Sequence, residues 1–441
     1  MRMTVIGTGY LGATHAACMA ELGHEVLGVD VDENKIEALK NSKVPFYEPG
    51  LPEVLERNID AGRLSFTTDY AQAAAFANVH FIGVGTPQQR GSYAADTRYV
   101  EAVIDDLVPQ LEGEHLILGK STVPVGTAAA LQERADKLVA ANGNKAQVEI
   151  AWNPEFLREG YAVKDTIEPD RIVLGVRGGT NAEEIAREIY ATPLANNTPF
   201  IVTDLQTAEL VKVSANAFLA TKISFINAVS EVCEIVGADV TQLADAIGYD
   251  DRIGRKFLGA GLGFGGGCLP KDIRAFMARA GEVGADQALT FLREVDAINM
   301  RRRQRVIDLA REELGSLIGR NITVLGAAFK PNSDDVRDSP ALAVAGQLSL
   351  AGASVKVYDP QGMDNARKVF PTLDYATSLE DALNGAELVI LATEWSEFKE
   401  MDPVWAAELV DRQLLIDGRN VLPVADWQNA GWQLRALGRS L

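Results

Sequence analysis

Short apolar runs alternate with helical patterns along the first part of the chain. Residues 3–6 are apolar and lead through a glycine-rich turn into an alanine-rich helical pattern at 13–22. Short apolar runs separated by helical patterns are typical of βαβ units, which form parallel sheets. The strands predicted in this part are 3–6, 25–29, 79–84, 115–119 and 148–151.

The same order returns near the C-terminus, after two long helical patterns at about 207–236 and 288–314. The first of these would be roughly 45 Å long at 1.5 Å per residue, more than one domain needs. We therefore expect a central helix that domains or subunits share. The strands predicted beyond it are 321–325, 355–358, 388–392 and 414–416.

These patterns predict an α/β protein in which two Rossmann-like domains, each with a doubly wound parallel sheet, are joined by a long central helix. The predicted domains are an N-terminal domain at 1–203, a central helical domain at 204–314 and a C-terminal domain at 315–441.

The turn after the first strand reads Gly7-Thr8-Gly9-Tyr10-Leu11-Gly12, and the second strand ends in Asp30. Glycines at these places let the backbone turn and approach a pyrophosphate at a helix N-terminus, and the acid accepts hydrogen bonds from ribose hydroxyls. Strand, turn, helix, strand and acid together predict a dinucleotide site in the N-terminal domain. NAD is favoured over NADP because a carboxylate at Asp30 would repel a 2′-phosphate.

Polar residues follow three later strands of the same domain. Thr86, Ser121 and Thr122 lie just past strand ends, where an open parallel sheet forms its ligand crevice, so we expect them to meet the cofactor. Turn and capping roles are the alternative. Glu155 follows the strand at 148–151 and is the predicted general base, with a solvated surface acid as the alternative.

Lys212 and Asn216 are four residues apart on the long helix, among apolar neighbours. This spacing places both side chains on one helix face. An ordinary surface lysine is the alternative, but the apolar surroundings favour a lysine in a site.

Six glycines fall within residues 259–267, directly before Cys268, Lys271 and Asp272. Each glycine costs roughly 0.5–1 kcal/mol in ordering relative to alanine, so something must approach this backbone closely. A thiol beside a cation and a carboxylate at a predicted helix start is placed to act as a nucleophile. A buried, inert cysteine is the alternative.

The net charge of the chain limits which classes of partner it can bind. A formal net charge of −19 argues against a nucleic-acid partner, so basic contacts to an anionic substrate must be local. Lys330, Arg337 and Arg419 follow strands of the C-terminal domain and are candidates for contacts to a diphosphate, with solvated surface positions as the alternative.

Several other classes of site are disfavoured. Three cysteines without CxxC spacing indicate neither a disulfide framework nor a zinc site, and no metal is expected. All four histidines precede residue 116, which disfavours a histidine base beyond it. Without a membrane-length apolar run or a signal-peptide pattern, we expect a cytoplasmic protein with no membrane partner.

The motifs resemble those of the UDP-glucose/GDP-mannose dehydrogenase family, the nucleotide-sugar 6-dehydrogenases, over essentially the whole chain. Residues 7–12 resemble the family's GxGYxG, 153–157 its NPEFL and 263–272 its cysteine segment. Gly267 and Leu269 depart from the Ser and Phe frequent there, which bears on fine specificity more than on reaction type. Residues 248–254 resemble the UDP-glucose members.

The resemblance implies a four-electron oxidation of UDP-glucose at C6 to UDP-glucuronate by two NAD⁺. Cys268 would hold the sugar first as a thiohemiacetal and then as a thioester. Lys212, with Asn216 beside it, would stabilise the oxyanion at C6. Asp272 and Thr122 would position a water for proton transfer.

By the same resemblance, Glu155 would assist hydrolysis of the thioester. The motif and the resemblance together predict cofactor contacts at Gly7, Gly9, Tyr10, Leu11, Gly12, Asp30, Lys35, Val84, Gly85, Thr86, Pro87, Gln88, Ser121, Thr122, Glu159 and Arg337. The substrate contacts implied are Phe156, Leu157, Arg158, Glu159, Lys212, Asn216, Arg252, Phe257, Leu258, Gly259, Gly261, Gly263, Phe264, Gly265, Phe329, Lys330 and Arg419. A homodimer through the long helix is expected, with Arg252 able to act on the neighbouring subunit.

Two alternatives stay open. The same chemistry on GDP-mannose or UDP-N-acetylmannosamine would use the same residue types. A catalytically silent protein that senses nucleotide sugar and NAD would bind both without producing NADH, and Cys268→Ser would leave its behaviour unchanged.

Overall fold

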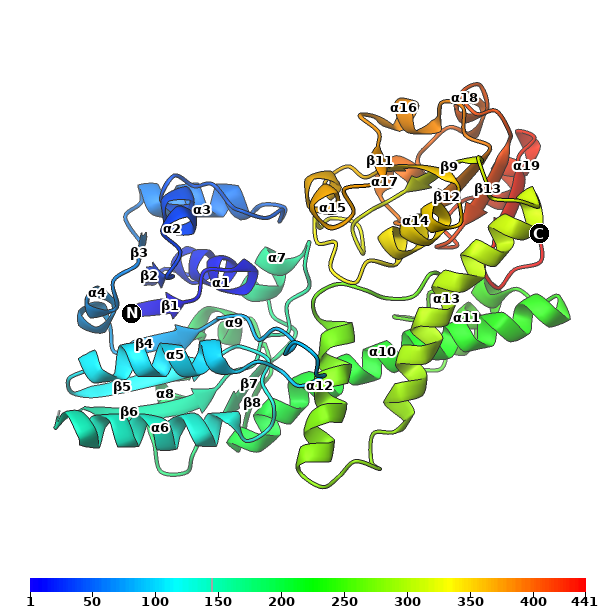
Figure 1. Ribbon diagram of the computed structural model, residues 1–441. Helices are drawn as coiled ribbons and strands as arrows, with labels where there is room; N and C mark the ends of the chain where they lie inside the picture. Colours follow the sequence, from blue (N-terminus) through cyan, green and yellow to red (C-terminus); the bar gives the residue numbers. More distant parts are fainter. Residues whose placement is uncertain (144–145) are drawn as a thin grey trace. The chain divides into compact units, whose positions relative to one another are not determined.

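The computed structural model describes residues 1–143 and 146–441 and divides them into two compact units (Figure 1). Unit one consists of Met1–Ala215 with Ala278–Gly284, and unit two of Asn216–Met277 with Ala285–Leu441. Among the described residues, no helix combines the length and apolarity needed to cross a bilayer.

Unit one is built on a sheet whose described strands have the order β3-β2-β1-β4-β5-β6-β7-β8. Neighbouring strands run parallel from β3 to β6, whereas β6 and β7 pair antiparallel through Trp152 and Gly175. The strands are β1 (Arg2–Ile6), β2 (Glu25–Val29), β3 (Leu64–Thr67), β4 (Val79–Ile82), β5 (Glu114–Gly119), β6 (Gln147–Trp152), β7 (Ile172–Gly175) and β8 (Phe200–Thr203).

Helices cover both faces of this sheet because its strands bury successive side chains on opposite faces. Val5 and Leu118 pack into one apolar core, and their neighbours Ile6 and Ile117 pack into the other. The helices are α1 (Tyr10–Glu21), α2 (Glu33–Lys40), α3 (Leu51–Asp60), α4 (Tyr70–Phe76), α5 (Arg98–Leu107), α6 (Thr127–Asn142), α7 (Ala162–Ile167), α8 (Ala182–Ile189) and α9 (Ala191–Ala195).

A chain of buried polar groups crosses the middle of this sheet. His80 Nδ1 lies 2.8 Å from Thr4 Oγ1, and His80 Nε2 lies 3.0 Å from His115 Nδ1. Burial, with a smaller contribution from the charge of His115, lowers the pKa of His80 to about 3. Folding therefore buries a neutral imidazole.

We expect unit one to lose stability in mild acid through His80. Below the unfolded-state pKa of about 6.5, His80 is protonated in the unfolded chain but stays neutral in the folded protein. Stability therefore falls as pH falls. At pH 5.5 the loss is about 1.4 kcal/mol for one such histidine. Urea denaturation of wild type and His80→Gln at pH 7.5 and 5.5 checks this. A variant with the wild-type pH slope would contradict it.

Unit two carries a second sheet, in which the described strands have the order β11-β10-β9-β12-β13-β14 and run parallel. The strands are β9 (Asn321–Leu325), β10 (Ser354–Tyr358), β11 (Asp374–Tyr375), β12 (Leu388–Leu391), β13 (Leu414–Asp417) and β14 (Gln433–Ala436). The helices around it are α14 (Pro340–Leu350), α15 (Met363–Val369), α16 (Leu379–Leu383), α17 (Ser396–Lys399), α18 (Pro403–Ala407) and α19 (Val424–Asn429).

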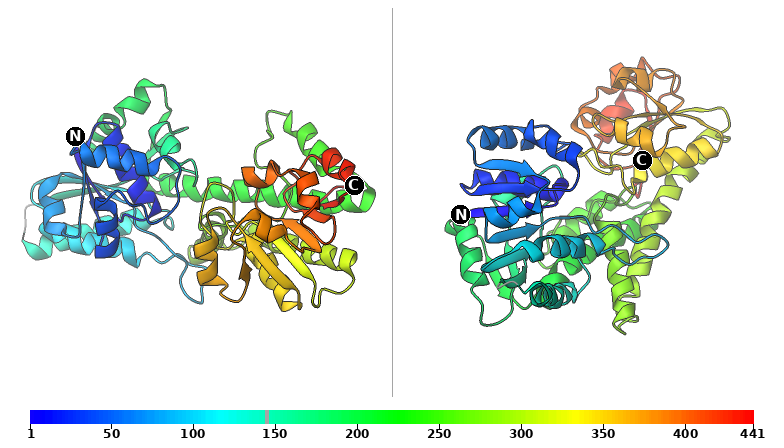
Figure 2. Two further views of the ribbon diagram at one scale, coloured as in Figure 1. Left: turned by 90° about the horizontal axis from the view of Figure 1, so that it is seen from above. Right: turned by 60° about the vertical axis from the view of Figure 1, so that its left-hand side comes forward.

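This sheet is also covered on both faces (Figures 1 and 2). Ile390 packs with Leu342 of α14 in one core, and its neighbour Leu391 packs with Phe398 and Trp427 in the other. The sheet order reverses between β9 and β12, and an open sheet of this type binds ligands beside such a reversal, at the strand ends.

Four further helices complete the fold: α10 (Leu205–Val236), α11 (Val240–Gly248), α12 (Leu269–Glu282) and α13 (Phe291–Leu314). Helix α10 is continuous over 32 residues and runs from unit one into unit two. The predicted architecture of two Rossmann-like doubly wound sheets and a long central helix is confirmed, and the antiparallel β6–β7 pair is the feature that the sequence analysis did not predict. The three-domain division stays a prediction.

Candidate active site

The turn after β1 has the backbone that a dinucleotide needs. Gly7 has a φ of +91°, and a Cβ there would lie 2.6 Å from Val84. A Cβ at Gly12 would overlap the carbonyl of Gly7, so this glycine lets α1 pack closely on the turn. At Gly9, by contrast, a Cβ would meet no described atom within 4 Å, and no described side chain caps α1. The open N-terminus of α1 beside Gly9 fits a pyrophosphate.

Asp30 lies at the end of β2, as predicted, and is 8% exposed. Its carboxylate accepts hydrogen bonds from Thr8 N (2.8 Å), Asp32 N (3.1 Å) and Lys35 Nζ (2.8 Å). Burial alone would raise the pKa of Asp30, but these donors lower it below its usual value. The predicted cofactor residues Asp30 and Lys35 therefore form an ion pair, in which the Asp30 carboxylate stays ionised.

The loops after β4 and β5 are tied together by two of the predicted cofactor residues. Thr86 Oγ1 donates to Thr122 O (2.6 Å), and Ser121 Oγ donates to Val84 O (2.7 Å). Both hydroxyls thus hold the strand-end backbone in place. Contact of Thr86, Ser121 or Thr122 with the cofactor stays a prediction.

A glutamate from α10 fixes the far end of the Thr122 loop. Glu209 accepts hydrogen bonds from Gly126 N and Ala128 N, both at 2.7 Å, at the start of α6. Burial outweighs these bonds and raises the pKa of Glu209 to about 7. The sequence analysis missed this residue because its partners lie 81 and 83 positions away.

Glu155, the predicted general base, is paired with a buried lysine. Lys120 Nζ lies 3.0 Å from Glu155 Oε2, with the two side chains 5% and 15% exposed. Glu155 Oε1 accepts the backbone N–H groups of Phe156 and Leu157 at 2.8 and 3.1 Å. Burial alone would lower the pKa of Lys120, but Glu155 and Tyr190 raise it. The surface-acid alternative for Glu155 is therefore wrong.

Two cations lie near the ring of Phe156. The guanidinium carbon of Arg171 lies 3.9 Å and Lys212 Nζ lies 5.5 Å from the centre of its ring. A cation at such a distance is attracted to the π face. Arg158, which points away into an ion pair with Asp165, is 57% exposed. Arg171 is a further residue that the sequence analysis missed.

Tyr10 of the glycine turn reaches the same loop through a buried glutamate. Its hydroxyl donates to Glu48, which also accepts Gly160 N (2.6 Å) and Ala162 N (2.7 Å). Burial and Glu48 raise the pKa of Tyr10 well above its usual value. Glu159, predicted to contact both ligands, is 8% exposed beside this junction. Glu48 thus links the dinucleotide turn to the predicted substrate loop.

The thiol of unit two stands at a helix start, as predicted. Cys268 is exposed, directly precedes α12, and accepts Asp272 N on its carbonyl at 2.9 Å. Asp272 is 2% exposed and accepts Asn216 Nδ2 and Lys271 Nζ, both at 2.6 Å. Asn216 and Asp272 are thus joined by their side chains, and the backbone N–H of Asp272 is bonded to the Cys268 carbonyl.

Lys212 and Asn216 lie four residues apart in the unbroken helix α10, which places both side chains on one face, as predicted. Lys212 belongs to unit one, with Thr122 and Glu155, and Asn216 to unit two, with Cys268 and Asp272. The cofactor residues predicted from the motif lie in unit one, while Arg337 lies in unit two, so its contact to the cofactor stays a prediction.

The glycine-rich loop before Cys268 is crowded by the protein's own atoms. A Cβ would lie 2.6 Å from Gly418 O at Gly261 and 2.7 Å from the Phe329 ring at Gly266. At Gly265 it would overlap the carbonyl of Asp338. Only at Gly259 does a Cβ among these meet no described atom within 4 Å. The predicted close approach is therefore real, and much of it comes from the chain itself.

The other predicted substrate residues of unit two differ in their surroundings. Arg419 donates to Ala392 O (2.7 Å) and Gly263 O (2.9 Å), so it joins the loop to two strand ends. Lys330 Nζ lies 5.3 Å from the centre of the Phe329 ring. Arg337 pairs with Asp335 at 2.6 Å. Phe257 has a left-handed backbone, Leu258 and Phe264 are buried, and the side chain of Arg252 is 88% exposed.

Comparison with known proteins gives matches along the whole chain. Three sequence models of the UDP-glucose/GDP-mannose dehydrogenase family match: the NAD binding domain at residues 1–194, the central domain at 206–301 and the UDP binding domain at 323–424. The chain is 42% identical to a UDP-glucose 6-dehydrogenase of Rhizobium meliloti, covering 100% of both chains. It is 41% identical to one of Bacillus subtilis, covering 99% of this chain and 93% of that protein.

Solved structures agree with this assignment. A UDP-glucose dehydrogenase of Pyrobaculum islandicum matches with a TM-score of 0.90 and 38% identity, covering 100% of this chain and 98% of that one. A UDP-N-acetylmannosamine dehydrogenase of Pyrococcus horikoshii matches with a TM-score of 0.85 and 25% identity, covering 100% and 99%.

Proposed function

The chain belongs to the UDP-glucose/GDP-mannose dehydrogenase family, and we propose that it oxidises UDP-glucose to UDP-glucuronate with two molecules of NAD⁺. One observation carries the reaction type: an exposed Cys268 at the start of α12, grouped with Asp272 and Asn216, in a chain whose first turn fits a dinucleotide. UDP-glucose is favoured because relatives of that name are about 40% identical over the full length.

The electron balance defines what Cys268 does. UDP-glucose, two NAD⁺ and one water give UDP-glucuronate, two NADH and three protons, and each NAD⁺ is the acceptor for one hydride. Between the two oxidations, the thiolate of Cys268 adds to the C6 aldehyde and forms a thiohemiacetal. The second oxidation makes this carbon a thioester, which water then cleaves to release the acid and the thiol.

The remaining catalytic residues are assigned by position. Lys212 faces the same side of α10 as Asn216, and we assign it to stabilising the oxyanion at C6. Asp272 is held by Asn216 and Lys271 in a fixed orientation, which suits it to position a water together with Thr122. The Glu155 carboxylate, bound by Lys120 and two backbone N–H groups, is suited to orient the hydrolytic water.

The nucleotide sugar is assigned to the strand ends of the UDP binding domain and to two loops. Lys330, Arg337 and Arg419 supply positive charge past β9 and β13 for a diphosphate. The loop at 156–159 and the open space at Gly259 are assigned to the sugar. The cytoplasm is the proposed location.

The experiment measures NADH formed per UDP-glucose consumed, with GDP-mannose and UDP-N-acetylmannosamine assayed beside it. Two NADH per UDP-glucose and the highest kcat/KM for this sugar are expected. One NADH per sugar would indicate a simple alcohol dehydrogenase, and a higher kcat/KM for another sugar would replace the substrate. Tight binding of both ligands with no NADH would favour the silent sensor.

We also propose a homodimer through α10. Phe218, Phe225 and Val232 recur every seven residues along this helix and are 66%, 52% and 57% exposed. A repeated exposed apolar row on one helix face is typical of a helix that packs on a partner. Arg252, 88% exposed and paired with Asp250, is then available to a neighbouring subunit.

Replacing Phe225 with Asp should separate the subunits. A charge in an apolar interface between helices is strongly unfavourable when nothing pairs with it. Light scattering after gel filtration should give twice the chain mass for wild type and the single chain mass for Phe225→Asp at the same concentration. Equal masses for the two proteins would place the dimer contact elsewhere or remove it.

A further inference from the structure

The glycine-rich loop that leads to Cys268 is held by two fully buried asparagines. Asn227 of α10 accepts Gly261 N on Oδ1 at 2.8 Å. Asn299 of α13 accepts Phe264 N at 2.7 Å and donates to Phe264 O at 3.0 Å. Both side chains are 0% exposed. A carboxamide that pairs with both the N–H and the C=O of one residue fixes the backbone of that residue in position and direction.

The glycine beside Asn299 fits this contact. Gly263 has a φ of +94°, and a Cβ there would overlap the amide oxygen of Asn299. An L side chain at Gly263 would strain the backbone and push Asn299 away from Phe264. Part of the glycine content of the loop is therefore required by the asparagine that holds it, in addition to any ligand.

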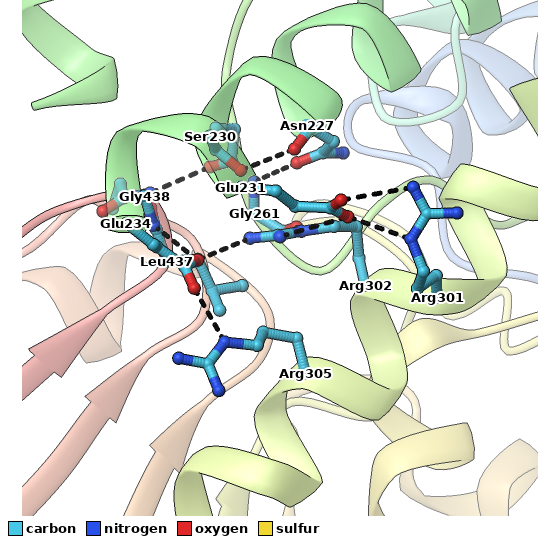
Figure 3. A network of polar contacts seen from close by, with 12 residues as sticks. Asn227, Ser230, Glu231, Glu234, Gly261, Arg301, Arg302, Arg305, Leu437 and Gly438 are labelled. Atoms are coloured by element: carbon cyan, nitrogen blue, oxygen red, sulfur yellow. Dashed lines mark hydrogen bonds and ion pairs between the residues drawn. The ribbon is translucent and has the colours of Figure 1, made fainter. Parts of the chain in front are cut away.

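A buried arginine contacts Gly261, the residue that Asn227 also binds (Figure 3). Arg302 is 0% exposed, its Nε lies 3.4 Å from Gly261 O, and its guanidinium is 3.3 Å from Glu234 and 3.7 Å from Glu231. Burial lowers the pKa of Arg302, although both glutamates oppose this shift. Burying an arginine is unfavourable unless its charge is paired and its N–H groups are bonded. Here the two glutamates pair with the guanidinium, and its Nε contacts the loop at Gly261 O.

Two neighbouring arginines provide an internal comparison. Arg301 pairs with Glu231 at 3.2 Å and Arg305 pairs with Glu234 at 2.7 Å, so each shares one carboxylate with Arg302. Arg301 is 51% exposed, and its hydrogen bonds go to Glu231 of α10 and not to the loop. Replacing Arg301 therefore disturbs the ion cluster without touching the loop backbone.

The loop connects this support directly to the thiol. Gly266 N donates to Arg337 O at 2.8 Å and Gly267 N donates to Asp335 Oδ2 at 3.2 Å, and Cys268 is the next residue. A shift at residues 261–264 is passed along a short, tightly bonded segment to the nucleophile. The same segment carries the residues assigned to the sugar.

We propose that Asn227 and Asn299, with Arg302 bonded to the same residue as Asn227, are positioning residues of the nucleotide-sugar site, acting through the glycine-rich loop. This proposal rests on the proposed function, because it assumes that the loop contacts a nucleotide sugar. It assigns to two buried amides the task of holding the substrate loop and Cys268 in one register.

The test measures KM for UDP-glucose, KM for NAD⁺ and the Kd of UDP in wild type, Asn299→Ala, Asn299→Asp and Asn227→Ala, with Arg301→Met as the control. Loss of the buried bonds should raise KM for UDP-glucose and the Kd of UDP roughly tenfold or more in both alanine variants. KM for NAD⁺ should stay within twofold, since the dinucleotide turn belongs to unit one. Asn299→Asp keeps the acceptor for Phe264 N, so its defect should be smaller than that of Asn299→Ala.

Equal rises in both KM values would indicate a general structural role and overturn the proposal. So would a folded Asn299→Ala with KM for UDP-glucose and Kd of UDP within twofold of wild type, or an Arg301→Met as defective as the asparagine variants. Should Asn299→Ala fail to fold, the same measurements on Asn227→Ala and Asn299→Asp test the proposal. If wild type makes no NADH from UDP-glucose, the proposed function fails, and the Kd of UDP across the variants still decides this inference.

Discussion

Replacing Cys268 with serine is expected to reduce steady-state NADH production from UDP-glucose by about three orders of magnitude or more. An alcohol is far less nucleophilic than a thiolate at neutral pH, so covalent capture of the C6 aldehyde becomes slow or ineffective. The first hydride transfer does not need the thiol. A single turnover should therefore still give up to one NADH per active site, followed by a stall.

The matched controls are the other two cysteines. Cys18 and Cys233 are 0% and 2% exposed, and Cys18→Ser and Cys233→Ser should keep the catalytic rate wherever the protein folds. Stopped-flow absorbance of NADH separates the burst from the steady state, and mass spectrometry of quenched wild type should find the sugar joined to Cys268. A Cys268→Ser protein within tenfold of the wild-type rate would refute the covalent route.

The strand pattern could be read from the sequence because each strand is a short apolar run in a buried sheet. The strand predicted at 321–325 agrees with β9, and the run at 115–119 misses β5 by one residue. Strands β3, β7, β8, β11 and β14 were missed, and their sequences are short or partly polar, as in Leu64–Thr67. The antiparallel turn into β7 depends on pairing between distant segments, which local patterning does not report.

Local motifs also predicted the positions of Asp30 and Cys268, because their chemistry depends on neighbours within one turn or one strand end. The supports of the site were not predictable in this way. Glu209, Asn227 and Asn299 act on backbone groups between 34 and 83 residues away. Each is a single polar residue in an ordinary helix, and its role arises only when the helices pack.

The partner of Lys120 was also not predictable from local sequence. This residue gives the prediction with the largest expected effect on stability. It directly follows β5, and its only sequence signal is a lysine placed after a buried strand. In the fold, its ammonium neutralises Glu155 at 3.0 Å with little exposure of either side chain. Replacing Lys120 with Met would leave the Glu155 carboxylate buried without its cation.

We expect Lys120→Met to lower the unfolding free energy of the protein by roughly 3–5 kcal/mol, the usual cost of breaking a buried pair by removing one partner. The double variant Lys120→Met with Glu155→Gln should recover much of this loss, because no uncompensated charge remains. Arg187→Met is the control, since Arg187 pairs with Glu183 through side chains that are 49% and 42% exposed, and it should change stability by less than about 1 kcal/mol. Urea denaturation at pH 7.5 measures all three.

Thioester hydrolysis separates stability from catalysis in the same set of variants. If Glu155 orients the hydrolytic water, Glu155→Gln and the double variant should accumulate sugar bound to Cys268, whatever stability the double variant regains. If the pair is only structural, the double variant should release product at the wild-type rate once it is folded. A Lys120→Met protein as stable as wild type would contradict the stabilising role of the Lys120–Glu155 pair. The role of Glu155 in orienting the hydrolytic water would then also lose its support.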